Sequence, residues 1–287
     1  MKRLPWGLVL LLAAGAAQAD WAGSAQPVRF APELQYAPFV FEDEQGRLRG
    51  LSVDLLTSLQ VRHGLQLQNL PARPLHQQLQ ALREGRADLI SSLRATPQRS
   101  EFLLFTRPYV RMPALLVVAA GTAQAPTGLA DLAGRQVAVG QDYAVEAVMR
   151  MKHPLVAWQP VPDDAVALAG VSNGRYSAAV VDRASLAYLQ RRNRVGALRV
   201  VGPVGFDYEL SFAVRKDWPA LRDALDRALA ALPAAELEAL SERWMSPDPD
   251  SLRPALRHSA LLAGTVLLGL GLVLLLLTGR TRSGDRP

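Results

Sequence analysis

The chain has 287 residues with no cysteine, a formal net charge of +6 and a pI near 10.0. The missing cysteine excludes disulfides, a thiol nucleophile and a thiolate metal site. The net charge does not indicate a nucleic-acid partner, because no run of lysine and arginine carries interleaved aromatic residues. Only about +2 of the charge belongs to the region between the two terminal segments described below.

The N-terminal segment 1–19 has the layout of a secretory signal peptide. It begins with the basic pair Lys2 and Arg3, continues as a short apolar run, and ends in the small-x-small sequence Ala17-Gln18-Ala19. Cleavage before Asp20 is expected, and an N-terminal membrane anchor is the alternative. The sequence therefore predicts that the following region is exported.

Residues 20–110 show strands alternating with helices. The first strand-like piece turns at Pro38, and a helix is predicted from about Ser52, where apolar residues recur at helical spacing. A second helix ends at Gly85 and is followed by the short strand "ADLISSL". Successive strand, helix and strand are expected to pair in parallel through right-handed crossovers.

The pattern repeats over residues 111–204, and the chain then returns in 205–246 with a strand, a long amphipathic helix and a last helix, "AAELEALSERW". We expect 20–110 and 205–246 to form lobe 1 and 111–204 to form lobe 2. Two lobes joined in this way leave a cleft between them, and small-molecule sites preferentially lie in such clefts. In the second unit, "RQVAVG" and "YSAAVVD" are the predicted strands, and "YAVEAVMRMK", "DDAVALAGVSNG" and "SLAYLQRR" are the predicted helices.

The C-terminal part reads as a Pro-rich linker, 247–258, followed by an uncharged stretch, 259–278. About twenty apolar residues are what a helix needs to cross a bilayer, so 259–278 is a predicted transmembrane helix. Arginines follow this stretch, and the positive-inside rule places the tail 279–287 in the cytoplasm. The two terminal segments agree on one topology, in which the region between them lies outside the cytoplasm.

Several motifs resemble, in order, those of family 3 extracellular solute-binding proteins, the amino-acid-binding type of periplasmic binding protein. The resemblance spans residues 28 to 246 and implies an α/β, two-lobed periplasmic binding protein type II fold (Venus-flytrap), here with one C-terminal transmembrane helix. Together with the predicted topology, it implies a periplasmic domain anchored in the bacterial inner membrane. The segment "VAVGQDYAVEAVM" with the membrane helix is most similar to sensor domains of hybrid histidine kinases. The other motifs are "YAPFVFEDEQGRLRGLSVDLL", "LREGRADLISSLRATPQRSEFLLFTRPY", "ALAGVSNGRYSAAVVDRASLAYL", "LSFAVRKDWPALRDALDRALAAL" and "LEALSERW".

Within this resemblance, Arg99 after Thr96 takes the position of the arginine that pairs with a ligand α-carboxylate. A guanidinium presents a planar fork of donors that matches two carboxylate oxygens. The alternatives are an intramolecular pair with Glu101 or Asp88, or a solvated surface arginine. Arg94 departs from the family pattern, and it either reads a second acidic group or points out of the cleft.

Asp182 matches the family carboxylate that holds a ligand α-amino group. Its alternative role is to cap the following helix, since Asp is favoured at that position, and both roles can hold together. Glu33 and Tyr36 match an acidic residue and an aromatic that covers the ligand, although Tyr36 is equally consistent with core packing. Ser92, with its neighbour Ser91, either adds hydrogen bonds or only ends the strand.

The turn "GQDYA" opens a helix whose free N–H groups are suited to binding a carboxylate, which makes Asp142 and Tyr143 candidate ligand residues. Many relatives have glycine where this chain has Asp142. The carboxylate of Asp142 could cap that helix and repel an anion, which puts an ordinary amino-acid ligand in doubt.

No cofactor or metal is expected, because the chain lacks HExxH, GxSxG and P-loop motifs and its histidines have no ligand spacing. The leading hypothesis is a non-enzymatic receptor for a small carboxylate-bearing solute, an amino acid or related acid. Its partner would be a transporter permease or a separate sensor kinase. The alternatives are a dehydratase-like enzyme on the same fold and a relic sensor domain that binds no solute.

Overall fold

The computed structural model describes residues 27–245. The predicted signal peptide, linker, transmembrane helix and cytoplasmic tail lie outside these residues. None of the helices within 27–245 combines the length and the apolar character that crossing a membrane requires.

Lobe 1 is built on parallel strands that confirm the predicted strand, helix and strand order. β1 (Val28–Phe30) pairs in parallel with β5 (Leu67–Asn69) and with β6 (Leu89–Leu93). Two helices connect these strands, α1 (Leu51–His63) and α2 (Leu75–Arg83). α1 buries Leu51, Leu55, Leu56 and Leu59 on one face and ends at Gly64, whose φ of 72° is in the left-handed region that glycine tolerates.

A small antiparallel sheet stands beside this unit and reaches toward lobe 2. It consists of β2 (Gln35–Tyr36), β3 (Val40–Glu42) and β4 (Leu48–Arg49). Phe41 in β3 packs into the apolar core of lobe 2. Lobe 1 is completed by α3 (Pro97–Ser100), β7 (Leu103–Phe105), α7 (Pro219–Ala230) and α8 (Ala234–Met245).

Lobe 2 repeats the architecture, and its central strands β9 and β11 are almost fully buried. β9 (Gln136–Gly140) pairs in parallel with β10 (Ala157–Val161) and β11 (Ala178–Asp182). Ala178, Ala179, Val180 and Val181 have no exposed surface, as expected for a strand covered on both faces. The helices of this lobe are η1 (Leu129–Leu132), α4 (Ala144–Lys152), α5 (Asp164–Ser172) and α6 (Arg183–Arg191).

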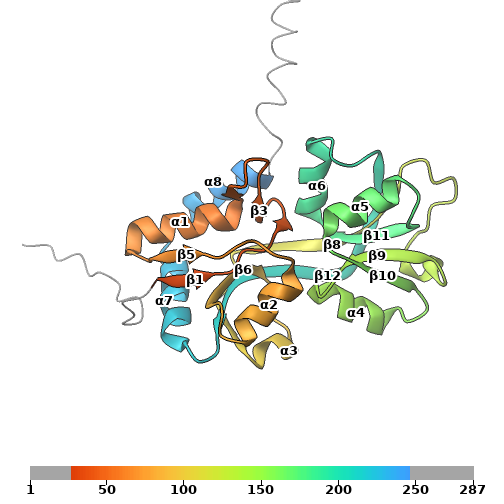
Figure 1. Ribbon diagram of the computed structural model, residues 1–287. Coiled ribbons are helices and arrows are strands. Elements are labelled where there is room, and N and C mark those ends of the chain that lie inside the picture. The colour runs from red at the N-terminus through yellow and green to blue at the C-terminus, as the bar shows by residue number, and fades with distance from the viewer. Residues whose placement is uncertain (1–26, 246–287) are drawn as a thin grey trace, which may run out of the picture. The chain divides into compact units, whose positions relative to one another are not determined.

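Two long strands join the lobes. β8 (Val110–Ala119) and β12 (Leu198–Arg215) pair antiparallel side by side between the two groups of elements, as Figure 1 shows. The C-terminal half of β12 also pairs with β6 and β7, so one sheet with the order β10-β9-β11-β8-β12-β6-β1-β5 runs through both lobes. The register of β12 shifts between Val200 and Gly202 and between Pro203 and Asp207, which are places where a strand bends.

Candidate functional site

The site begins with Arg99, which α3 positions at the boundary of the lobes. Thr96 caps this short helix by accepting a hydrogen bond from the Arg99 backbone N–H at 3.2 Å. Arg99 is only 6% exposed. Its two terminal nitrogens donate to backbone carbonyls, to Arg94 at 2.7 Å and to Asp142 at 2.7 Å.

The charge of Arg99 is not neutralised by a direct partner. Within residues 27–245, no carboxylate forms an ion pair with its guanidinium, and Asp88 pairs instead with Arg29 and Arg215. Burial lowers the pKa of Arg99 to about 10, and the charge of Glu33 works in the opposite direction. Arg99 therefore forms no ion pair with Glu101 or Asp88 in the described part of the chain, and it is not the solvated surface arginine that the sequence also allowed.

Glu33 and Tyr143 connect the two lobes across the site. The Tyr143 hydroxyl donates to Glu33 Oε1 at 2.7 Å, and both residues are buried. Removal from water raises the pKa of Glu33 to about 7, while the Tyr143 hydrogen bond and the charge of Arg99 lower it. The Tyr36 ring packs in tilted geometry, with its centroid 5.5 Å from that of Tyr143 and 5.1 Å from that of Phe39, and it also lines the small cavity described below.

Asp182 caps α6, as one of its two predicted roles required. Its Oδ1 accepts from the backbone N–H groups of Ala184 and Ser185, both at 2.8 Å, and its Oδ2 accepts from the Ser185 hydroxyl at 2.6 Å. The residue has no exposed surface, and desolvation raises its pKa.

The serines at the end of β6 belong to a buried hydroxyl network. The Ser92 hydroxyl lies 2.9 Å from that of Ser52, its N–H donates to the Tyr109 hydroxyl at 2.7 Å, and Ser91 is within 3.4 Å. Ser92 has a φ of 59°, a left-handed conformation that this network holds in place. Ser92 also lines the space between the lobes.

The structure shows where the side chains of Arg94 and Asp142 lie. Arg94 turns toward β12, where it donates to the Asp207 carbonyl, lies 3.4 Å from Glu209 and stacks 4.6 Å from the Phe206 ring. The Asp142 carboxylate does not cap α4, since that helix has no side-chain cap and Glu146 accepts the Asp142 N–H at 2.8 Å. Asp142 has a φ of 60°, which explains why glycine suits this turn.

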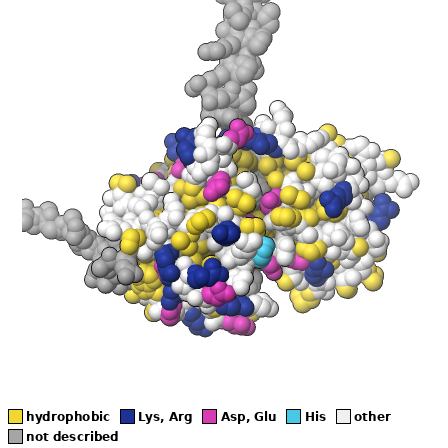
Figure 2. All heavy atoms as spheres, in the orientation of Figure 1, with side chains coloured by type: hydrophobic (Ala, Val, Ile, Leu, Met, Phe, Trp, Pro, Cys, Tyr) yellow, Lys and Arg dark blue, Asp and Glu magenta, His cyan; other side chains and the backbone are white. Residues whose placement is uncertain are grey.

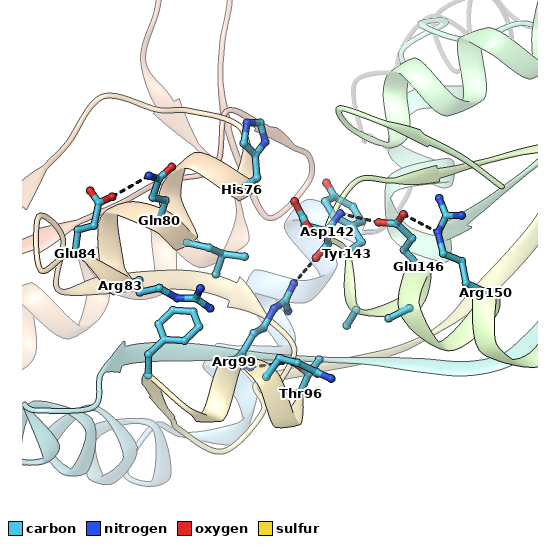
Figure 3. A pocket seen from close by; sticks show the side chains of 15 residues that line it. His76, Gln80, Arg83, Glu84, Thr96, Arg99, Asp142, Tyr143, Glu146 and Arg150 are labelled. Atoms are coloured by element: carbon cyan, nitrogen blue, oxygen red, sulfur yellow. Dashed lines mark hydrogen bonds and ion pairs between the residues drawn. The ribbon is translucent and has the colours of Figure 1, made fainter.

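The predicted site residues line two spaces, except for Asp182, which lines neither of them. A cavity of about 20 Å³, roughly the room of one water molecule, is lined by Glu33, Tyr36, Arg99, Tyr143 and Tyr208, among others. A pocket of about 680 Å³ opens on the other side of Arg99, between α2 and α4. Figure 3 shows Arg99 pointing toward Asp142, with His76, Gln80 and Glu84 on one wall and Glu146 and Arg150 on the other.

On the face in Figure 2, charged side chains of both signs are interspersed and form no single basic stripe.

Two residues of this region were not predicted from the sequence. Asp164 opens α5 and is 3% exposed, and Tyr208 lies in β12 and is also 3% exposed. Asp163, the neighbour of Asp164, caps α5 by accepting a hydrogen bond from the Val166 N–H at 2.8 Å. In the sequence the two aspartates therefore resemble ordinary residues of a helix start. In the sequence Tyr208 lies between Asp207 and Glu209, two residues before "LSFAVR", and nothing in that surrounding pattern indicates a buried hydroxyl.

Relatives of the chain fall into two groups. Residues 28–247 match the family model of bacterial extracellular solute-binding proteins, family 3. The virulence sensor protein BvgS of Bordetella pertussis is 27% identical over 263 residues, which covers 91% of this chain and 21% of that protein. The histidine-binding periplasmic protein of Salmonella typhimurium is 30% identical over 263 residues, covering 86% of this chain and 98% of that protein. The chain thus spans about a fifth of the sensor relatives.

Solved structures share the architecture. The crystal structure of the B. pertussis BvgS periplasmic domain matches with a TM-score of 0.73 at 26% identity, covering 86% of this chain and 48% of that one. An ancestral amino-acid-binding protein, described as a precursor of cyclohexadienyl dehydratase, matches with a TM-score of 0.69 at 25% identity, covering 79% and 99%. The two-lobed α/β fold expected from the sequence is confirmed.

Proposed function

The chain belongs to the bacterial extracellular solute-binding proteins of family 3, and from that premise we propose that it binds a small α-amino acid between its lobes. The observation that carries the proposal is Arg99, a buried guanidinium with no carboxylate partner in the described part of the chain. A buried cation without a counter-charge is costly, so an anionic ligand is the partner that this position favours. A ligand carboxylate would compete with the Asp142 carbonyl for the terminal nitrogens of Arg99.

The ammonium group of the amino acid would lie near Asp182. Although Asp182 caps α6, each carboxylate oxygen accepts more than one hydrogen bond, so a cap and a ligand contact are compatible. Tyr36 would cover the ligand. Thr96 would support binding by holding the backbone of Arg99 in place, and Ser92 would line the space that the ligand enters. Tyr143 would have to leave Glu33 as the lobes separate to admit the solute.

We propose that the ligand works by biasing lobe closure. The lobes are joined by β8 and β12, whose register shifts provide bending points. A ligand that contacts Arg99 in lobe 1 and Asp182 in lobe 2 binds the closed state better than the open one, and this difference sets the population of each.

We further propose that the domain is exported and anchored through 259–278. A permease or a separate sensor kinase would recognise the closed conformation of its lobes. The contacts of Trp244 support this coupling. Its indole N–H donates to Asp54 of α1 at 2.9 Å, its ring lies 5.9 Å from Phe41, and its carbonyl accepts from Arg191 of α6 at 3.3 Å. Trp244 thus touches both lobes fifteen residues before the predicted membrane helix.

The proposal is tested by the thermal stability of the purified chain with each amino acid, with dicarboxylates and with aromatic acids. A ligand at about a hundred times its dissociation constant should add about 2.7 kcal/mol to the free energy of unfolding. Arg99→Ala should lose this increase. Arg107→Ala is the matched control, because Arg107 is exposed and pairs with Asp226 at 2.9 Å. An unchanged response of Arg99→Ala would show that Arg99 does not bind the ligand.

A dehydratase-like activity is the second candidate, favoured by the buried acid Glu33 with its pKa of about 7. We favour binding without turnover, because no local motif of the sequence identifies a catalytic acid. Conversion of a prephenate-like acid by the purified chain would establish the enzyme. No stabilisation by any compound would instead indicate a domain that has lost its solute.

A further inference from the structure

A separate groove lies between the small sheet of lobe 1 and the helices α5 and α6 of lobe 2, where β3 and α6 stand close together in Figure 1. Its volume is about 770 Å³, and none of the residues assigned to the solute lines it. Phe41 and Tyr188, with ring centroids 5.5 Å apart, and Trp244 supply its aromatic lining. We call it the arginine groove, because four arginines also line it, Arg47, Arg49, Arg192 and Arg194.

These arginines come from both lobes. Arg47 and Arg49 belong to the hairpin of β3 and β4 in lobe 1, and Arg192 and Arg194 follow the end of α6 in lobe 2. Arg191, the last residue of α6, is already engaged, since it donates to the Trp244 carbonyl at 3.3 Å. An anion in the arginine groove would therefore contact both lobes at once.

The Tyr188 hydroxyl lies where these positive charges converge. Removal from water raises the pKa of Tyr188, and the positive charges around it lower the pKa; these charges belong to Arg192, Arg194, Arg191 and Arg49. The Arg192 guanidinium lies 4.9 Å from the centroid of the Tyr188 ring. Within residues 27–245, no hydrogen bond engages the Tyr188 hydroxyl. It is therefore an unused donor in positive surroundings.

The carboxylates of the groove leave an excess of positive charge. Three of the four are engaged, as shown by the ion pairs of Asp43 with Arg47 at 2.9 Å and of Glu44 with Arg194 at 2.6 Å, and by the cap that Asp163 provides for α5. Glu42 is the fourth. Arg49 and Arg192 are exposed and form no ion pair in the described part of the chain. Two unpaired cations thus face one unpaired carboxylate.

We propose that the arginine groove binds a phosphate group, held by Arg49 from lobe 1, by Arg192 from lobe 2 and by the Tyr188 hydroxyl. A guanidinium presents parallel donors that match two phosphate oxygens, and a phosphate supplies the negative charge that these arginines lack. Arg194 would join them by exchanging Glu44 for the phosphate. That exchange is inexpensive, because Glu44 is 80% exposed and such a surface pair contributes little.

The place of the groove in the chain favours a phospholipid head group as the source of the phosphate. Trp244 lines the groove and precedes the predicted membrane helix 259–278 by fifteen residues, which span at most about 50 Å. Basic side chains close to a membrane surface are attracted to anionic lipids. This choice of source rests on the proposed anchor, whereas the phosphate site does not. A soluble phosphate ester presents the same group.

A phosphate in this position would act on the solute site. Because Arg49 and Arg192 belong to different lobes, a phosphate that contacts both stabilises the closed arrangement relative to the open one. A solute that also favours closure would then bind more tightly in the presence of phosphate, and phosphate more tightly in the presence of solute, by the same factor.

The test is thermal unfolding of the purified full chain, followed by tryptophan fluorescence. For the soluble source, the chain is reconstituted in phosphatidylcholine vesicles and titrated with inorganic phosphate and with glycerol 3-phosphate. For the lipid source, these vesicles are compared with vesicles that contain phosphatidylglycerol. We expect the unfolding temperature to rise with the phosphate compound or with phosphatidylglycerol. Sodium chloride at the same ionic strength should not reproduce the rise, because screening acts on all exposed charges alike.

Variants of the two unpaired arginines locate the site. Arg49→Gln and Arg192→Gln should each weaken phosphate binding at least about tenfold, as the loss of a charge-assisted contact implies. Tyr188→Phe should weaken it less, because it removes one donor and keeps the ring. Arg175→Gln is the matched control and should bind as the wild type does. Arg175 is also exposed and lies over a tyrosine, 5.5 Å from the Tyr176 ring centroid, but it does not line the groove.

The outcomes distinguish the sources and the two proposals. A rise with phosphatidylglycerol alone would assign the phosphate to the membrane, and a rise with the soluble compounds alone would support the site and overturn the lipid source. A rise that both Arg49→Gln and Arg192→Gln retain, or no rise in any arm, would overturn the site. The titrations contain no amino acid, so this failure leaves solute binding at Arg99 intact, and a failure of solute binding leaves the phosphate site intact.

Discussion

Glu33 gives the site a pH dependence of predictable sign. Burial raises its pKa from the ordinary 4.5 to about 7, so the folded state holds this proton more tightly than the unfolded state does. The free energy of unfolding therefore falls as pH rises from about 4.5 to about 7, by at most about 3 kcal/mol from this group. Asp164 and Asp182, whose pKa values are also raised, contribute in the same direction.

Glu33→Gln should reduce this slope, because glutamine cannot ionise. Urea unfolding between pH 5 and pH 8 measures it, with the exposed Glu238→Gln as the control that keeps the wild-type slope. An unchanged slope in Glu33→Gln would show that Glu33 titrates near its ordinary pKa in the folded protein.

Single residues were predictable only where a motif gave them a position. Arg99 and Asp182 were predicted by spacing and by resemblance; Arg99 lines both cavities, whereas Asp182 lines neither and caps α6. Arg94 could not be placed, because its direction depends on Glu209 and Phe206, more than a hundred residues away. Asp164 was missed because its burial follows from the packing of α5 against β11, which a local pattern does not reveal.

The connection from β9 to α4 controls how Tyr143 reaches lobe 1. Gly140 ends β9, and a Cβ atom there would lie 2.5 Å from the Tyr143 ring. Gly140→Ala should therefore push the ring aside, weaken the hydrogen bond to Glu33 and lower the melting temperature by several degrees, as a loss of about 1 kcal/mol implies.

Gly202→Ala is the matched control for that change. Gly202 has no atom within 4 Å of its added Cβ, and its φ is not in the left-handed region. It should melt close to the wild type. A Gly140→Ala protein with wild-type stability would mean that Tyr143 adjusts without losing Glu33.

Elements were predicted well where one periodicity ran uninterrupted. The leucine spacing of α1 and α2, and the glycines that end α2 and α5, gave helices that the structure confirms. β10 was missed because Pro160 weakens its strand pattern, and α3 was missed because four residues are too short for a helical period. β12 was predicted only at its end, since Gly202, Pro203 and Gly205 resemble a turn although the strand continues through them.

Across the described part of the molecule, the two lobes meet through aromatic contacts, such as Phe41 with Tyr188, and through several polar contacts. These include Tyr143 with Glu33, Arg99 with the Asp142 carbonyl, and the Ser185 hydroxyl with the Ala37 carbonyl at 2.8 Å. An amino acid that stabilises the protein should slow hydrogen exchange at 33–41 and 140–150, because those segments face each other across the site.

The same experiment contains its own control. α7 packs on β7 and β12 away from the site, so its exchange should not change until the protein unfolds globally. Equal protection of α7 and of the site segments would indicate overall stabilisation without a change in lobe closure.

The position of Trp244 gives the protein an optical property. The half-buried indole packs on Phe41 of lobe 1 and on the apolar cluster of lobe 2 to which Tyr188 belongs. Lobe separation would bring water to a ring that closure covers, and indole emission shifts to longer wavelength in water. The native fluorescence of the chain therefore carries a component that follows the distance between the lobes, without any added label.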